Sequence, residues 1–143
     1  MNVETVTQDK FDAVTFQIVT PDGNMFITIS EDDNGVPNAI WIHIGKAGSA
    51  VGAWSNALAR LMTLCLDKGG TINDLIVELS NQTSDKFRMT NDGEAVRSGI
   101  EGVWVALMKY KRDRFEQVSK TLGDIDERGR GPRLGRRVPR STQ

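Results

Sequence analysis

The sequence contains one cysteine and one histidine, and this scarcity excludes several classes of protein. Among 143 residues, Cys65 carries the single thiol and His43 the single imidazole. A disulfide framework within the chain is therefore excluded, and one Cys with one His cannot build a zinc site of the usual kind. A Ser-His-Asp hydrolase would need His43 as its base, and no pattern around His43 supports that role.

Long apolar runs are also missing, and aromatic residues make up only 6% of the chain. The apolar stretches are far too short to cross a bilayer, so we expect no membrane association. Residues 1–12 are acidic and polar, unlike a secretory signal or a transit peptide. With 38% hydrophobic and 26% charged residues, the composition predicts a soluble globular domain of ordinary size.

The net charge of −1 hides an uneven distribution of charge along the chain. Six of the 18 basic residues lie between Arg128 and Arg140, in a segment without acids, so residues 1–127 carry 12 basic and 19 acidic residues, a net charge of −7. An acidic body is a poor general nucleic-acid binder, because binding that releases counterions needs a basic face. The Gly- and Pro-containing tail is predicted to be disordered. It is either an arm for nucleic acid or an acidic partner, or a solvated extension.

Three segments predict strands, because they are rich in β-branched and aromatic residues. They are residues 11–19, 25–30 and 38–44. In the third, isoleucines alternate with Trp41 and His43, which therefore share the opposite face. The Pro-Asp-Gly-Asn turn at 21–24 and the polar loop at 31–37 separate the segments. We expect an antiparallel meander.

The hydrophobic period then changes to that of a helix. Ser49 is positioned to cap a first helix, and Lys68-Gly69-Gly70 to end it. Its expected inward positions are Val51, Trp54, Leu58, Leu61, Met62 and Cys65. Thr71 is expected to cap a short second helix. Its expected inward positions are Ile72, Leu75, Ile76 and Leu79.

Residues 82–96 are polar and irregular, and a third helix follows them. Ser98-Gly99-Ile100-Glu101 fits a capping box, and the helix is expected to run to about residue 115. Its apolar stripe is Ile100, Val103, Trp104, Leu107 and Met108. The expected fold class is α+β: a small antiparallel sheet of three or more strands, followed by two to three helices packed on one face. The predicted parts are a flexible lead-in at 1–10, a domain at 11–118 and a basic, disordered tail at 119–143.

The connection from the third strand to the first helix is the most chemically informative segment. Gly45 and Gly48 allow tight turns, Lys46 adds a positive charge, and Ser49 opens a helix whose first amides point outward. These features favour a phosphate or carboxylate site. They are equally those of a tight strand-to-helix connection with a good cap. A Walker A loop is absent.

The stretch from IHIGKAGSAVGAW through LIVELSN, followed by GEAVRSGIEGVWVAL, resembles the TSCPD domain over roughly residues 25–108. That domain occurs at the C-terminus of adenosylcobalamin-dependent ribonucleotide reductases and in small stand-alone proteins. The family's Ser-Cys-Pro-Asp motif is replaced here by Ser98-Gly99-Ile100-Glu101, so a metal or redox role of its cysteines is not carried over. The reductase chemistry itself is excluded by the length and by the single cysteine.

In layout and size, the chain is also similar to small phage proteins that sequester nucleotide signals of bacterial immunity. One such family counters Thoeris defence by binding cyclic ADP-ribose isomers. Its members are oligomers with ligand sites between protomers. No motif aligns residue by residue, so this resemblance is one of architecture alone. It implies a cytoplasmic protein of the infected bacterial cell and a homo-oligomer with inter-protomer sites.

A nucleotide binder needs cations for phosphates, a flat apolar surface for the base and polar groups for its edges. The loop supplies Gly45, Lys46, Gly48 and Ser49, and the first helix supplies Arg60. The long polar segment supplies Phe87 as a stacking ring, Asn91 as an edge reader, and Arg88 and Arg97 as cations. Trp41 is either a base platform, an oligomer contact or a packing residue.

These residues favour a non-enzymatic protein that binds a phosphate-bearing small molecule of the cyclic-nucleotide class. No cofactor and no metal is expected, and no general base with a clear orienting partner is evident. The alternative is an accessory or regulatory module of ribonucleotide reduction that acts on a reductase partner. Nucleic-acid binding is expected only through the tail at Arg128–Arg140.

Overall fold

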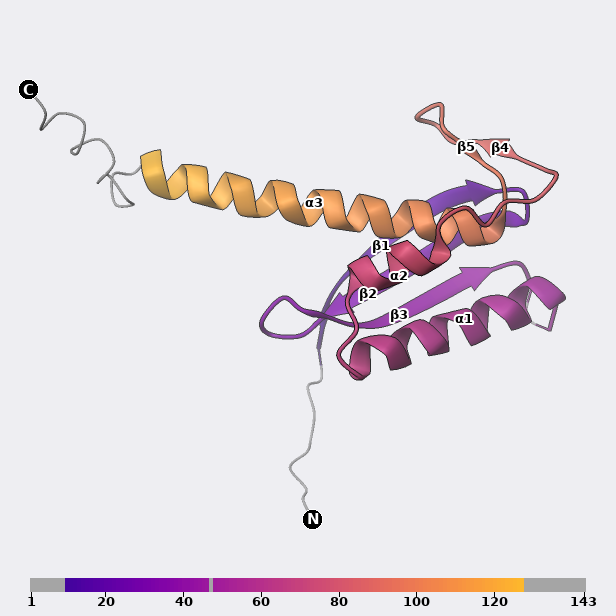
Figure 1. Cartoon of the computed structure of the whole chain (residues 1–143), viewed down its shortest axis with the longest axis horizontal. Coiled ribbons are helices and arrows are strands. Elements are labelled where there is room, and N and C mark those ends of the chain that lie inside the picture. Colours follow the sequence, from indigo (N-terminus) through magenta and orange to yellow (C-terminus); the bar gives the residue numbers. More distant parts are fainter. Residues whose placement is uncertain (1–9, 47, 128–143) are drawn as a thin grey trace, which may run out of the picture. The chain divides into compact units, whose positions relative to one another are not determined.

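A computed structural model describes residues 10–46 and 48–127 of the chain. The chain divides into two compact units, 1–108 and 109–143, and each is described by itself. In chain order, the elements are β1 (Asp12–Thr20), β2 (Gly23–Glu31), β3 (Pro37–Ile44), α1 (Ala50–Asp67), α2 (Ile72–Leu79), β4 (Arg88–Met89), β5 (Ala95–Val96) and α3 (Gly99–Glu127) (Figure 1). This is the expected α+β arrangement. No described helix is both long enough and apolar enough to cross a membrane.

The strands β1, β2 and β3 form an antiparallel meander in that order, so β3 is an edge strand. The β1–β2 turn is tight because Gly23 adopts a φ of +127°, a conformation that side chains rarely allow. The Thr20 hydroxyl supports this turn by donating to the Gly23 carbonyl over 2.8 Å. The register places Ile18 beside Met25 and Met25 beside Ile44, which gathers the large apolar side chains on one face.

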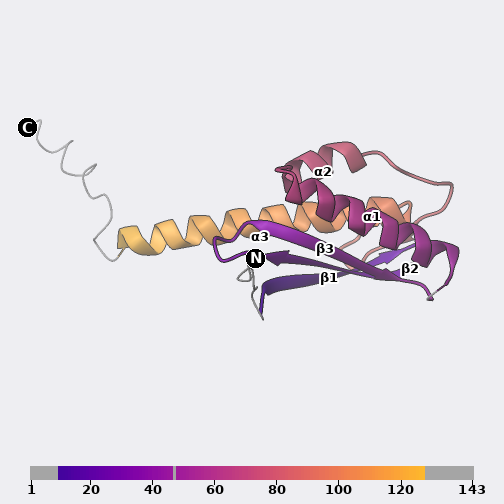
Figure 2. The same cartoon turned by 90° about the horizontal axis from the view of Figure 1, so that it is seen from below.

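That apolar face forms the core of the first unit, and the helices lie on it (Figure 2). Met25, Ile27 and Ile29 are completely buried, each contributing about 1.5–3 kcal/mol by the usual transfer energies. The beginning of α3 approaches the sheet closely at Gly102, where a Cβ atom would lie 2.6 Å from Thr20 Cγ2 and 3.1 Å from Met25 Cε. The expectation that the helices pack on one face is confirmed.

The ends of α1 are as expected, but its inward stripe differs from the predicted one. Ser49 caps the helix by accepting from the Gly52 amide over 3.0 Å, and Gly69 (φ +98°) follows its C-cap. The buried positions are Ser55, Ala59 and Met62. Leu61, expected inside, is 62% exposed. Small residues at 55 and 59 let α1 approach the sheet, while Leu61 and Leu64 remain exposed.

Helix α2 follows the sequence prediction. The Thr71 hydroxyl accepts from the Asp74 amide over 3.1 Å, and the Asp74 carboxylate accepts from the Thr71 amide over 2.9 Å. Ile72, Leu75 and Ile76 are buried. The segment expected to be irregular contains the two-residue strands β4 and β5, which pair antiparallel.

The start of α3 is fixed by three side chains. Ser98 accepts from the Glu101 amide over 2.9 Å, while the Glu101 carboxylate accepts from the Arg97 amide over 2.6 Å. The Asp22 carboxylate, in the β1–β2 turn, accepts from the Gly99 amide over 3.1 Å.

The helix α3 runs to Glu127, past the expected end near residue 115 and through the first nine residues of the expected tail. The first proline after Pro37 is Pro132, so no proline interrupts the helix before Glu127. Residues 1–9 of the lead-in predicted at 1–10, and the arginine-rich residues 128–143, lie outside the described residues.

Candidate functional site

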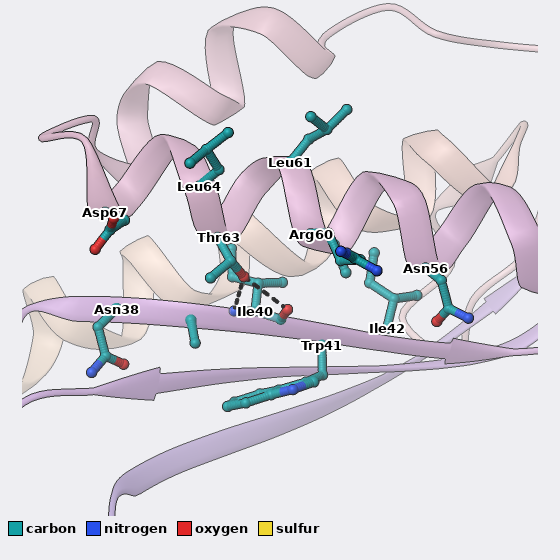
Figure 3. A pocket seen from close by; sticks show the side chains of 12 residues that line it. Asn38, Ile40, Trp41, Ile42, Asn56, Arg60, Leu61, Thr63, Leu64 and Asp67 are labelled. Carbon is teal, nitrogen blue, oxygen red and sulfur yellow. Dashed lines mark hydrogen bonds between the residues drawn. The ribbon is translucent and has the colours of Figure 1, made fainter. Parts of the chain in front are cut away.

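The edge strand β3 and the helix α1 enclose a groove of about 760 Å³ (Figure 3). Its walls come from two elements that are consecutive in the chain and run antiparallel to each other. The lining residues are Asn38, Ala39, Ile40, Trp41, Ile42, Asn56, Ala59, Arg60, Leu61, Thr63, Leu64 and Asp67. The volume falls within the range of small-molecule sites.

Thr63 holds the two walls of this groove together. Its hydroxyl accepts from the Ile40 amide over 3.0 Å and donates to the Ile40 carbonyl over 3.2 Å. Both backbone groups of Ile40 thus point away from β2, toward the free edge of the sheet. A helix side chain occupies the position that a fourth strand would take, so the groove has a rigid base.

Polar side chains lie at both ends of the groove. Arg60 and Asn56 are one helical turn apart on α1, at the end near Ile42. Asn38 and Asp67 lie at the opposite end, where the Asn38 amide oxygen accepts from the Ser30 hydroxyl over 2.6 Å. The groove therefore presents a cation with an amide at one end and a carboxylate with an amide at the other.

Trp41 projects to the other side of β3, away from α1, as Figure 3 shows. Its side chain is 54% exposed, so the helices do not cover this sheet face at that position. In the register, Phe26 lies opposite His43 and Thr28 lies opposite Trp41. Phe26 and His43 are exposed as well. The face opposite the isoleucines thus carries an exposed aromatic cluster (Phe26, Trp41 and His43) at the rim of the groove.

The glycine loop before α1 adopts the predicted tight conformation. Gly45 and Gly48 have φ values of +72° and +84°. The Ser49 hydroxyl donates to the Lys46 carbonyl over 2.6 Å and accepts from the Gly52 amide over 3.0 Å. One of the amides at the helix start is therefore already satisfied within the loop. Lys46 is exposed, and the loop follows β3 directly beyond the end of the groove that holds Arg60 and Asn56.

The candidates in the polar segment lie on the β4–β5 hairpin. Phe87, Arg88 and Asn91 are exposed, and the Thr90 amide donates to the Glu94 carbonyl over 2.8 Å to close the turn around Asn91. Strand β4 lies beside β1. Since β1 and β3 are the two edge strands of the sheet, the hairpin lies at one edge of the sheet and the groove lies at the other.

Arg97 differs from the other candidate cations because it has a carboxylate neighbour. Its guanidinium lies 3.8 Å from the Glu101 carboxylate, four residues later. The backbone amide of Arg97 donates to the same carboxylate. Arg97 thus contributes to the start of α3, and its charge is partly compensated there.

Sequence reasoning placed Arg60 in the site but missed Asn38, Asn56, Thr63 and Asp67. A signal was present for three of them. Asn56, Thr63 and Asp67 lie with Arg60 at helical spacings of four, three and four residues, which form one polar stripe on α1. Asn38 has no such signal, because it joins the groove from another element.

A three-stranded sheet covered on one face by helices, with a groove at its edge, defines a small α+β domain. Residues 3–111 match the model of the TSCPD domain, so the chain belongs to the TSCPD domain family. The searches of curated proteins and of solved structures gave no match.

Proposed function

We propose that the protein binds a nucleotide in the β3–α1 groove and sequesters it unchanged, with a cyclic nucleotide or a cyclic ADP-ribose-type immune signal as the ligand class. The observation that carries this proposal is the placement of Arg60 and Asn56 together at one end of a groove whose rim holds the exposed ring of Trp41.

Each group suits one part of such a ligand. The planar guanidinium of Arg60 matches two phosphate oxygens, and such charge-assisted pairs are stronger than neutral hydrogen bonds. The amides of Asn38 and Asn56 offer both donors and acceptors to a base or a ribose. The face of Trp41 can stack on a base, an interaction that tolerates any base.

The chemistry of the groove lining supports sequestration of the ligand rather than its conversion. Arg60 and Asp67 are the titratable residues among the side chains that line the groove, and they lie toward opposite ends of it. Neither His43 nor Cys65 belongs to the lining. The groove therefore offers recognition groups without a paired nucleophile and base.

A second copy extends the proposal. The hairpin residues Phe87, Arg88 and Asn91 lie at the sheet edge opposite the groove within one chain. A ligand that touched both groups would most simply lie between two copies, with the groove from one and the hairpin from the other. Lys46, at the adjoining loop, adds a cation on the groove side.

The alternative function is an accessory module of ribonucleotide reduction that acts on a reductase. Membership of the TSCPD family favours it, because this domain also occurs at the end of adenosylcobalamin-dependent reductases. The replacement of the family's Cys-Pro pair by Gly99-Ile100 is the feature of this chain that weighs against a shared metal or redox role.

A thermal-shift panel tests the proposal with deoxynucleotides, cyclic ADP-ribose isomers, and cyclic di- and trinucleotides. A ligand at 100 times its Kd should raise the stability by about 2.7 kcal/mol, and heat denaturation should release it with its mass unchanged. We expect Arg60→Ala to weaken binding about 10- to 100-fold, as for other charge-assisted contacts. Lys68→Ala, at the end of the same helix and outside the groove lining, is the matched control.

Three outcomes would contradict the proposal. The absence of a shift with every nucleotide, together with co-purification of a large reductase subunit, would favour the alternative. Release of a cleaved ligand would show an enzyme. Equal affinities of the Arg60 and Lys68 variants would place the site outside the groove.

A further inference from the structure

The second unit carries an exposed apolar stripe whose residues do not line the β3–α1 groove. In residues 109–127 of α3, the large apolar side chains Phe115, Val118 and Leu122 are 71%, 54% and 62% exposed. Their spacings of three and four residues place them on one side of the helix. We call these three residues, with Lys111 four positions before Phe115, the α3 seam.

The spacing of the seam is that of a heptad repeat. With Phe115 and Leu122 as a positions, Lys111 and Val118 fall at d positions, and the sequence continues the pattern at Ile125. A repeat of seven residues keeps a narrow stripe facing one partner helix along the whole length, whereas a helix covering a sheet usually has a wider apolar face. The occupant that fits this seam is therefore another helix with the same spacing.

The charges of the same segment select the partner and its direction. Residues 109–114 contain Lys109, Lys111, Arg112 and Arg114 against Asp113, a net charge of +3. Residues 116–127 contain four acids against Lys120, a net charge of −3. Two copies aligned in parallel would place like charges together, while two antiparallel copies would place each basic half beside an acidic half.

Three of these four acids lie at the C-terminal end of the helix. The last turn of α3 contains no basic residue, and acids occupy Asp124, Asp126 and Glu127. Acidic residues at a helix C-terminus interact unfavourably with the helix dipole. The basic half of an antiparallel partner would compensate this cost.

We propose that the α3 seam is the surface through which two copies of this chain associate, as an antiparallel helix pair. Phe115 of each copy packs against Val118 of the other, which sets Lys111 opposite Leu122. The long stem of Lys111 covers the leucine while its ammonium reaches the acidic half. The proposal stands apart from the nucleotide function, because no seam residue lines the β3–α1 groove.

Sedimentation equilibrium of the full chain tests this surface. We expect an even multiple of the 15.8 kDa chain mass, and we expect Phe115→Ser with Leu122→Ser to raise the dissociation constant of the pair at least about 100-fold. Both side chains are exposed in the single chain, so circular dichroism should show unchanged folding. Lys120→Ser, on the outer side of the same helix, should leave the mass unchanged.

Cross-linking tests the direction. Two single-cysteine chains, Arg114→Cys and Thr121→Cys, are made in a Cys65→Ser background. In antiparallel copies the two positions flank the seam on the same side, so the two chains should form disulfide-linked pairs when they are mixed. Neither chain should form such pairs when it is oxidised alone. Self-linking of either chain alone would contradict the antiparallel arrangement. A monomeric wild-type chain, or a double variant with the wild-type mass, would refute the surface itself.

Discussion

At the scale of single residues, a glycine of α3 allows the helix to pack tightly on the sheet. Gly102 is buried in the first part of α3, and a Cβ there would approach Thr20 Cγ2 to 2.6 Å. Such a distance requires the helix or the strand to move, since β1 and β2 are held in register by backbone hydrogen bonds. The residue thus sets how closely α3 approaches the sheet.

Replacing this glycine should therefore destabilise the fold, although alanine is the better helix former. We expect Gly102→Ala to lower the free energy of unfolding by about 1–3 kcal/mol, the usual cost of overpacking, measured by urea denaturation. Gly123→Ala is the matched control, because a Cβ there meets nothing within 4 Å. It should be neutral or should raise helix content slightly. Equal effects at both sites would show that α3 does not approach the sheet as described.

At the scale of elements, the pairing of α1 with β3 depends on one hydroxyl. Thr63 bonds to both backbone groups of Ile40 at the sheet edge. Because Thr63 comes from the helix and Ile40 from the strand, the groove and the packing of α1 share this contact. Its loss should affect stability and ligand binding together.

The substitution Thr63→Val keeps the shape of the side chain and removes the hydroxyl. We expect a loss of about 1–3 kcal/mol in the free energy of unfolding, because two backbone groups lose their partner. The control is Thr28→Val, where the hydroxyl pairs with Thr15 over 2.7 Å on the exposed face. That change should stay within about 0.5 kcal/mol. If thermal denaturation shows the same loss for both, the edge contact is not what fixes α1.

The elements could be predicted from the sequence where the signal is local. The alternation around Trp41 and the helix caps at Ser49 and Thr71 each depend on neighbouring residues, and each is confirmed. The inward face of α1 could not be predicted, because the close packing of the helix on the sheet puts small residues such as Ala59 on its buried side. Leu61 has the stronger hydrophobic signal, yet it is exposed.

The candidate site was less predictable, since a groove arises between elements. The polar stripe of α1 is visible in the sequence, but its position beside the β3 edge is not. The sequence also grouped the candidates Arg60 and Arg88 in one site, whereas the structure places them at opposite edges of the sheet. Periodicity predicts which residues share a face, and only packing decides which faces meet.

At the scale of the whole molecule, association through the α3 seam should link stability to concentration. A folded chain that pairs is stabilised by mass action, so its thermal midpoint should rise with protein concentration. We expect this rise for the wild-type chain and its loss for Phe115→Ser. Scanning calorimetry over a wide concentration range measures it, and a concentration-independent midpoint for the wild type would contradict association.

The bond between Asp22 and Gly99 has a consequence for the order in which the chain folds. It joins residues 77 positions apart, and closing such a loop costs about 4 kcal/mol of chain entropy. The end of the sheet formed by Ile18 and Met25 is covered by α3, which leaves the ribosome after both the sheet and α1. During synthesis, the apolar side chains at this end of the sheet therefore remain exposed to solvent until residue 102 has left the ribosome. The growing chain is most exposed to aggregation in that interval, and the final docking of α3 ends it.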